Sequence, residues 1–470
     1  MPLFHPYAMQ IAPKHRPPLD PGFQPAVLWH REYARLVRED AGSHPLAIAL
    51  VRADGTVSRF DLDVLPHTGE NATLNRKIVE RLIKFLLWQR GGYRIVIGGD
   101  PAIADMVRGI YSPEGARAFD HGFMGQKIYG HPMTVESCAI ADVPTGRESS
   151  MPLGRNLEGC RIGFDLGGSD RKCAAVIDGE VVFSEEVVWD PYFQSDPQYH
   201  YDGINDTLRR AAAKLPRVDA IGGSAAGVYV NNEVRAASLF RGVSEADFEQ
   251  RVRRIFFDLK REWNDVPFEV VNDGEVTALA GSMSMNDNAV LGISMGTSLA
   301  GGYVNPDGHI LPWLNELAFA PIDYRDDAPL DEWSGDIGCG VQYFSQQGVA
   351  RLIPLAGIAV PEGMPFAERL IEVQTLMAAG DDRAAAIYET IGVCFGYAIA
   401  HYATFYELRN LLILGRVTSG RGGELILEKA AQVLADEFPE LHRQIQLRTP
   451  NEQDKRHGQA VAAASLPKVI

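Results

Sequence analysis

Two hydrophobic periodicities run along the chain, and both are clearest in its C-terminal two thirds. Short apolar runs, each ending in glycine or a polar turn, predict buried strands at 161–165, 218–221, 268–271, 290–294 and 411–414. Apolar residues three or four positions apart predict helices at 205–214, 275–281, 366–379, 382–407 and 423–437. Strands that alternate with helices in this way indicate α/β architecture.

The first 155 residues have a pattern of their own. Residues 2–25 hold seven prolines and few periodic apolar positions, which predicts an irregular arm. A short helix at 28–37, strands at 46–51 and 56–60 around an Asp-Gly turn, a helix at 74–89 and a strand at 93–97 follow. Residues 111–155 are rich in glycine and proline and poorly periodic, so we place a domain boundary near Arg155.

One order of elements occurs twice: strand, Asp-Gly, strand, helix, strand, Gly-Gly. The distance from Gly55 to Gly98 and from Gly179 to Gly222 is about 43 residues in each case. A diverged internal duplication predicts that 46–98 and 172–222 are superposable. The alternative is chance, because this order of elements is common.

Composition excludes several classes of function. The chain has 470 residues, is 46% hydrophobic and carries a net charge of −16, which argues against general affinity for nucleic acids or anionic membranes. No apolar run approaches the roughly 18 residues of a membrane helix, and the N-terminus lacks the features of a signal peptide. Five scattered cysteines without a CxxC spacing favour a reducing compartment, so we expect a cytoplasmic protein.

A phosphate-binding turn is indicated after the strand at 161–165. It contains Asp165, Gly167, Gly168 and Ser169. Glycine amides can approach phosphate oxygens closely, and a carboxylate at a strand end can hold magnesium through water. Taken alone, the same residues also fit a tight hairpin.

Two further turns follow apolar strands. In the first, Gly296 precedes Thr297 and Ser298, whose hydroxyls could bind a transferring phosphoryl group. In the second, Gly415 and Arg416 follow the strand at 411–414. Because ligands of α/β proteins lie at the carboxyl ends of strands, three such turns predict a nucleotide held in a cleft.

Asn272 and Asp273 stand between a strand and a helix. Phosphoryl transfer to an alcohol needs positioning, neutralisation of charge and a base for the hydroxyl proton, and Asp273 suits the role of base. An Asn-Asp N-cap of the following helix is an equally good interpretation at this point.

The order of these motifs resembles the ROK family of bacterial sugar kinases and sugar-responsive repressors, within the sugar-kinase/hsp70/actin superfamily. The family's D-x-G-G-[ST] phosphate loop is matched at 165–169, and its Asn-Asp pair, in which the aspartate is the catalytic base, at 272–273. Its GTG-x-G-G-G loop is matched in part at 296–302, and its terminal Gly-x-Ala-x-Ala helix at 458–462. Its G-E-x-G-H segment is similar to Asn315–Phe319, here called the sugar loop. The resemblance spans about residues 160–470.

The resemblance implies a two-lobed, ribonuclease-H-like (actin/hexokinase-type) kinase fold. We expect an additional N-terminal α/β domain at 1–155, a small lobe at 159–281 and a large lobe at 290–470. The implied activity is phosphorylation of a sugar-like hydroxyl by ATP and Mg²⁺, without nucleic-acid or membrane partners and with a homodimer left open. The implied residues are Asp273 as base and Asp165 for magnesium; Gly167, Gly168, Ser169, Gly296, Thr297, Ser298, Gly415 and Arg416 for ATP; and Asn272, Glu316, Ser238 and Gly227 for substrate.

Departures from the family pattern concern its structural zinc. The family uses CxCGxxGC and the histidine of the sugar loop, whereas Glu332, Ser334 and Phe319 replace three of these ligands here. A lone Cys339 cannot make a tetrahedral site, so we predict no zinc. We expect apolar packing of Phe319 and Trp333 to hold the sugar loop instead.

Other departures concern the ligands. Ser238 replaces a sugar-binding asparagine and Arg416 replaces a glycine near the expected adenine, which leaves a non-catalytic sugar or nucleotide sensor as an alternative. A different phosphoryl donor, such as polyphosphate, or an ATPase acting on a non-sugar substrate also remains open. An anionic substrate would need local cations, for which the candidates are Arg171, Lys172, Arg235 and Arg241.

Overall fold

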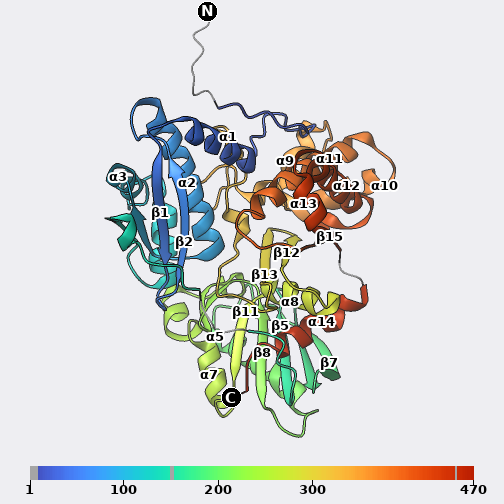
Figure 1. Cartoon of the computed structure of the whole chain (residues 1–470). Coiled ribbons are helices and arrows are strands. Elements are labelled where there is room, and N and C mark those ends of the chain that lie inside the picture. The colour runs from blue at the N-terminus through green and yellow to red at the C-terminus, as the bar shows by residue number, and fades with distance from the viewer. Residues whose placement is uncertain (1–8, 149–152, 450–451, 470) are drawn as a thin grey trace, which may run out of the picture.

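The structure is a computed structural model that describes residues 9–148, 153–449 and 452–469. Figure 1 shows the N-terminal sheet (blue) beside the helices of the large lobe (orange), with the small lobe (green) below both. The fold is α/β throughout, as the alternating periodicities predict. None of the helices in the described ranges has the length and apolar character needed to cross a bilayer.

The small lobe is built on a five-stranded sheet with the order β11-β8-β5-β6-β7. β5, β6 and β7 form an antiparallel meander, whereas β8 and β11 extend the sheet in parallel from β5. The carboxyl ends of β5 and β11 therefore lie at one edge and carry Asp165 and Asn272. The bounds are β5 Cys160–Leu166, β6 Asp170–Ile177, β7 Glu180–Val188, α5 Pro197–Ala212, β8 Ala220–Ala225, β9 Val228–Val230, β10 Glu233–Ala236, α6 Glu245–Asp247, α7 Ile255–Glu262, β11 Phe268–Asn272 and α8 Asp273–Met285.

The large lobe has a four-stranded sheet with the order β13-β12-β14-β15. β13 is antiparallel to β12, while β14 and β15 are parallel to it. Helices α9 to α12 form the layer drawn in orange in Figure 1. The bounds are β12 Val290–Met295, β13 Leu299–Val304, α9 Gln346–Leu355, α10 Phe366–Ala378, α11 Asp382–Tyr402, β14 Asn410–Leu414, α12 Gly420–Glu437, α13 Pro439–Gln444 and β15 Gln446–Arg448.

The C-terminal helix α14 (Glu452–Ala464) returns to the small lobe. It approaches the sheet so closely that a Cβ at Gly163 or Gly222 would overlap the carbonyl oxygens of Ala460 and Ala463. The expected large lobe at 290–470 is therefore wrong at its end, because the last helix covers the small-lobe sheet.

The N-terminal part forms a sheet with the order β2-β1-β3-β4. Its fourth strand and a π-helix at His121–Tyr129 lie in the segment whose weak periodicity predicted irregular structure. Short elements contain too few residues to show a periodicity, so the prediction of irregular structure is wrong for this strand and this π-helix. The bounds are α1 Ala26–Glu39, β1 His44–Val51, β2 Val57–Val64, α2 Gly69–Arg90, β3 Arg94–Gly98, α3 Pro101–Ile110, α4 Ala118–Asp120 and β4 Thr134–Cys138.

The expected duplication of 46–98 and 172–222 is wrong in its strand order. β3 pairs directly with β1 in the N-terminal sheet. Its counterpart β8 pairs instead with β5, a strand that precedes the proposed repeat and separates β8 from β6. The two segments share an order along the chain but not an arrangement in space.

A single hydrophobic core joins the N-terminal part to the large lobe. Buried residues of both belong to one cluster that runs from Phe23 to Ile445. The rings of Phe85 and Phe405 stack with centroids 4.4 Å apart, and Phe23 lies 5.5 Å from Tyr343. Residues 9–148 are thus packed as a layer of the large lobe.

A buried ion cluster reinforces this interface. Lys84 on α2 is fully buried, and its Nζ lies 2.7 Å from Asp120 Oδ1 and 3.6 Å from Asp336 Oδ2. Arg81 Nη2 donates to the Asp336 carboxylate at 3.0 Å. Because Asp336 belongs to the large lobe, the cluster fastens α2 to the segment that includes Cys339, whose Sγ is 3.6 Å from Asp336 Oδ2.

Replacing Lys84 by methionine is expected to lower the free energy of unfolding by about 3 to 5 kcal/mol, because Asp120 then keeps a buried charge without its cation. Urea denaturation measures this loss. The matched control is Lys127→Met, which removes a surface pair with Glu245 and is expected to cost about 0 to 1 kcal/mol. Equal effects of the two variants would contradict the role given to the buried cluster.

Candidate active site

Asp273 is the first residue of α8 and directly follows β11. The cap of this helix is Asn272, whose Oδ1 accepts a hydrogen bond from the Gly274 amide at 2.7 Å. Asn272 Nδ2 donates to the Gly227 carbonyl at 2.7 Å, so both ends of the amide are engaged. The capping role that the sequence left open therefore belongs to Asn272, and the carboxylate of Asp273 stands at the first turn of the helix.

Three carboxylates from separate elements meet at this point. Asp165 is the penultimate residue of β5, Asp273 begins α8 and Glu316 belongs to the sugar loop. Burial, reinforced by the charge of Asp165, raises the pKa of Asp273 to about 6. Burial and the charge of Asp273 raise the pKa of Glu316 to about 7. The charge of Asp165 thus acts on Asp273 and that of Asp273 on Glu316, so Asp273 lies near both of the other carboxylates.

Asp165 has partners that favour its ionised form. Burial raises its pKa, whereas a hydrogen bond with Ser224 and the nearby charge of Lys172 lower it. Oxygen donors on a carboxylate and an adjacent hydroxyl are the groups that magnesium accepts.

The phosphate loop at 167–169 is the tight connection between β5 and β6. The Gly167 amide donates to the Asp170 carbonyl at 2.9 Å, and Trp189 Nε1 donates to the Gly167 carbonyl at 2.8 Å. Tyr192 lies against Gly168 so closely that no Cβ would fit there. Ser169 is exposed. The tight-hairpin interpretation of this glycine pair is therefore confirmed, and phosphate binding by the same turn stays a prediction.

The other two turns lie on neighbouring parallel strands of the large lobe. Thr297 and Ser298 are exposed between β12 and β13, where the Gly296 amide donates to the Ser298 carbonyl at 2.9 Å. Gly415 follows β14 with φ 106° and no room for a Cβ beside the Met295 carbonyl. Because β12 and β14 are parallel, these turns share one edge of the sheet.

A cavity of about 690 Å³ opens beside the end of β14. Small-molecule sites usually measure about 300 to 1,000 Å³, so its size suits a nucleoside. Gly415 and Arg416 line it as expected, and further residues come from α8 and from Arg448 near the C-terminus.

The sugar loop is held by the N-terminal part of the chain. The Asn315 amide donates to the Gln89 carbonyl at 2.9 Å, and the Glu316 amide donates to the Trp88 carbonyl at 3.0 Å. Both carbonyls belong to the last turn of α2, where helix carbonyls lack partners within the helix. Sequence reasoning missed this support because backbone acceptors leave no signature in a sequence.

A buried network continues from the sugar loop to α8. Asn315 Nδ2 donates to Glu275 Oε1 at 2.5 Å, and Tyr406 Oη donates to Asn315 Oδ1 at 2.7 Å. Burial raises the pKa of Glu275 to about 8 despite these bonds. Glu275 was not recognised from the sequence, although its position two residues after Asp273 places it on the same helix.

Aromatic packing of the sugar loop is confirmed. The rings of Phe319 and Trp333 lie 4.5 Å apart, and Trp88 of α2 lies 4.6 Å from Phe319. Phe119 and Phe123 complete the cluster from the N-terminal part. Within the described residues, no group of three or more His, Cys, Asp or Glu side chains is placed to hold a metal.

The remaining predicted substrate residues come from the segment after β8. Gly227 contacts the site through Asn272, whereas Ser238 is exposed at the start of a 3-10 helix. Among the described residues, no hydrogen bond joins Ser238 to Asp273 or Glu316. The structure therefore places Ser238 in the same lobe as α8 without linking it to the carboxylates.

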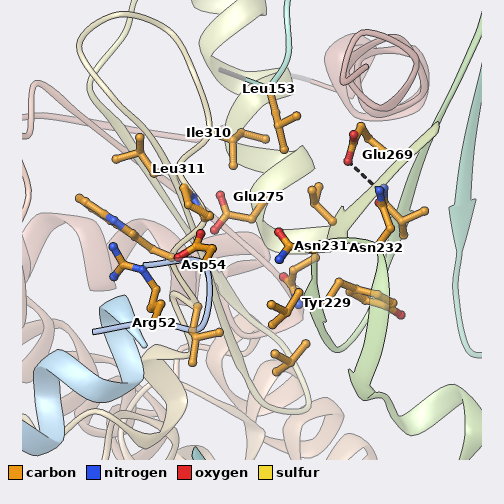
Figure 2. Close-up of a pocket in the computed structure, with 18 of the residues that line it drawn as sticks. Arg52, Asp54, Leu153, Tyr229, Asn231, Asn232, Glu269, Glu275, Ile310 and Leu311 are labelled. Atoms are coloured by element: carbon orange, nitrogen blue, oxygen red, sulfur yellow. Dashed lines mark hydrogen bonds between the residues drawn. The ribbon is translucent and has the colours of Figure 1, made fainter. Parts of the chain in front are cut away.

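A second pocket, whose lining includes Asn272, lies between the β1–β2 turn and both lobes; Figure 2 shows Arg52 and Asp54 of that turn facing it. Its volume of about 140 Å³ is below the usual range for small-molecule sites. The guanidinium of Arg52 in its wall is already bonded to Thr56, Ser58 and Glu148. Its small volume and the occupied guanidinium argue against this pocket as the substrate site.

Comparisons with known proteins agree with this geometry. No family model and no curated protein sequence matches the chain. A ROK hexokinase from Thermus thermophilus superposes with a TM-score of 0.52 at 18% identity, covering 66% of this chain and 97% of the hexokinase. The chain has the ROK fold. A ROK family transcriptional regulator, a homologue of the E. coli MLC protein, also superposes with a TM-score of 0.52, at 19% identity, over 66% of this chain and 79% of the regulator.

The ROK fold confirms the two-lobed actin/hexokinase-type architecture expected from the motif order. The part of the chain that is covered, 66%, equals the share made up by residues 160–470.

The ionised carboxylate of Asp273 is expected to lower the free energy of unfolding at neutral pH. An ordinary aspartate has a pKa near 3.9, so raising it to about 6 means that stability falls as pH rises from about 4 to about 6. Asp273→Asn should therefore be more stable than the unmodified protein above pH 6, by on the order of 1 to 3 kcal/mol, and equal to it below pH 4.

Thermal unfolding at pH 4 and pH 8 measures this difference. The control is Asp307→Asn, at an exposed position, which should leave the melting temperature unchanged at both values. A stability gain for Asp273→Asn that does not depend on pH would show that titration of this carboxylate is not its source.

Proposed function

We propose that the chain is a kinase that transfers the γ-phosphoryl group of ATP to a hydroxyl of a sugar or a sugar-like polyol. The observation that carries this proposal is the convergence of Asp165, Asp273 and Glu316 from β5, α8 and the sugar loop. A buried carboxylate at the first turn of a helix, beside two others, suits proton transfer, and its hydrogen bond from the Gly274 amide, at 3.0 Å, leaves its second oxygen available.

Asp273 acts as the general base. With a pKa of about 6 it is mostly ionised at neutral pH and still basic enough to accept a hydroxyl proton. The acceptor oxygen forms a bond to the γ-phosphorus while the bond from that phosphorus to the β,γ-bridging oxygen breaks. The electron pair of the broken bond leaves with ADP, and the hydroxyl proton goes to Asp273.

Magnesium fits the oxygen donors at the end of β5. Asp165 would hold it through water, because magnesium keeps several waters and takes only one or two protein carboxylates. A bound magnesium ion neutralises charge on the phosphate oxygens during transfer. Burial raises the pKa of Asp165, and the nearby charge of Lys172 opposes this rise and so favours the ionised form that would hold magnesium.

The nucleotide would lie across the cleft between the lobes. The cavity beside Gly415 and Arg416 would take the adenosine, and the exposed hydroxyls of Thr297 and Ser298 would face its phosphates. Gly167, Gly168 and Ser169 would approach the γ-phosphate from the small lobe, and Gly296 from the large lobe. This arrangement places both phosphate loops beside the proposed base.

Glu316 would orient the acceptor. A pKa near 7 lets its carboxyl group accept a hydrogen bond from one hydroxyl or donate to another. Its backbone is fixed by the Trp88 carbonyl, so the position of the group is set before substrate binds. Asn272 and Gly227 position the start of α8, and Ser238 is proposed to contact the acceptor from the small lobe.

The second candidate function is a sensor of sugar or nucleotide without catalysis. The ROK regulator with the same TM-score as the hexokinase favours it. The hexokinase, however, is matched over 97% of its length and the regulator over 79%. A sensor has no use for a base, so the arrangement around Asp273 favours the kinase.

Asp273→Asn is expected to lower the rate of acceptor-dependent ADP formation by 10²- to 10⁴-fold, because the proton of the hydroxyl loses its acceptor. In the unmodified protein the rate should fall as pH drops below about 6, where Asp273 becomes protonated. A coupled assay across hexoses, amino sugars, sugar acids and polyols measures both effects, with Asp307→Asn as the matched control. Binding of acceptors without turnover for any of them would overturn the kinase and favour the sensor.

A further inference from the structure

The four basic residues that could bind an anionic substrate differ in whether a neighbouring carboxylate already pairs with them. Arg171 is buried and bonded to Asp206 at 2.7 Å, and Lys172 lies 3.3 Å from Asp170. Arg235 pairs with Glu233 at 2.6 Å. Three of the four candidates are thus neutralised by a neighbouring carboxylate.

Arg241 is the exception. It is exposed, and its side chain makes no hydrogen bond or ion pair with any residue that the structure describes. Its guanidinium carbon lies 3.9 Å from the centroid of the Tyr192 ring and 5.4 Å from that of Phe193. A guanidinium stacked by its face on an aromatic ring keeps the N–H donors in its plane free, and these match the two oxygens of a carboxylate or a phosphate.

The stack stands next to the proposed catalytic apparatus. Tyr192 covers Gly168 of the phosphate loop, and the Arg241 amide donates to the Ser238 carbonyl at 3.2 Å. The segment that carries Tyr192 is itself anchored to the phosphate loop, because the Trp189 amide donates to the Ser169 carbonyl at 3.1 Å. Arg241 therefore lies between the phosphate loop and the residue expected to contact the acceptor.

The position of Arg241 would affect how an anionic acceptor is oriented. Asp165, Asp273 and Glu316 repel a negative group from the centre of the cleft, while Arg241 attracts one at its edge. An acceptor with an anionic group at one end would be turned so that this end meets Arg241 and a hydroxyl meets Asp273. A neutral acceptor receives no such orientation.

We propose that Arg241 binds an oxyanion of the acceptor, so that the substrate is an acidic sugar: a sugar acid or a sugar phosphate. This inference rests on the proposed kinase function. Arg241 then determines specificity, and Tyr192 positions it.

Acceptor-dependent ADP formation tests the proposal with D-glucose, D-gluconate, D-glucuronate and D-glucose 6-phosphate. At least one anionic acceptor should show a kcat/KM tenfold or more above that of glucose. Arg241→Met should lower that value 10- to 100-fold through KM while changing the value for glucose less than twofold. Arg241→Lys should restore part of the loss, because it keeps the charge without the planar fork.

Arg254→Met is the matched control, since Arg254 is an exposed arginine of the same lobe stacked on Phe257 at 5.3 Å. It should leave all acceptors unaffected. Equal losses for glucose and the anionic acceptors in Arg241→Met would overturn the proposal and assign Arg241 to the transferred phosphoryl group. No preference for any anionic acceptor would overturn it as well.

A separate measurement distinguishes failure of the inference from failure of the kinase function. If no acceptor is turned over, the kinase function fails, and titration calorimetry with gluconate and glucose 6-phosphate still decides the role of Arg241. Binding to the unmodified protein that weakens tenfold or more in Arg241→Met supports the anion site. Absent binding, or equal binding by both proteins, overturns it.

Discussion

The contact between the C-terminal turn of α2 and the sugar loop is the constraint on which the cleft depends. Two backbone carbonyls at Trp88 and Gln89 fix the loop, and the ion cluster around Lys84 fastens the same helix to the large lobe. Backbone hydrogen bonds of this kind cannot be moved by a change of side chain. The position of Glu316 relative to Asp273 therefore depends on the N-terminal layer.

This contact explains how the large lobe manages without the ligands of the family's zinc site. A metal would hold the loop at 332–339 by bonds to three or four side chains. Here a buried charge network around Asp336 and an aromatic cluster around Trp333 hold the same segment. The N-terminal layer supplies most of the partners, which accounts for its large shared core with the large lobe.

The parts of the fold that could be predicted are those with long periodic segments or strand-turn motifs. Asp165 and Asp273 were found because each follows an apolar strand at a position where the fold needs a polar group. Strand β4 and the π-helix escaped because they are short, and the duplication failed because order along a chain does not specify which strands pair. The carbonyls of α2, the buried Glu275 and the free guanidinium of Arg241 depend on tertiary contacts, which local sequence does not record.

The return of α14 to the small lobe affects the order in which the parts of the chain can fold during synthesis. Ala460 and Ala463 of this helix lie against Gly163 and Gly222, so this part of the small-lobe sheet stays uncovered until residues 452–464 are available. During synthesis from the N-terminus, the N-terminal layer and the large lobe can collapse onto each other first. Asp273 and Asp165, the proposed base and magnesium ligand, therefore reach their final setting late, and a ribosome stalled before residues 452–464 would carry a chain whose small lobe is unfinished.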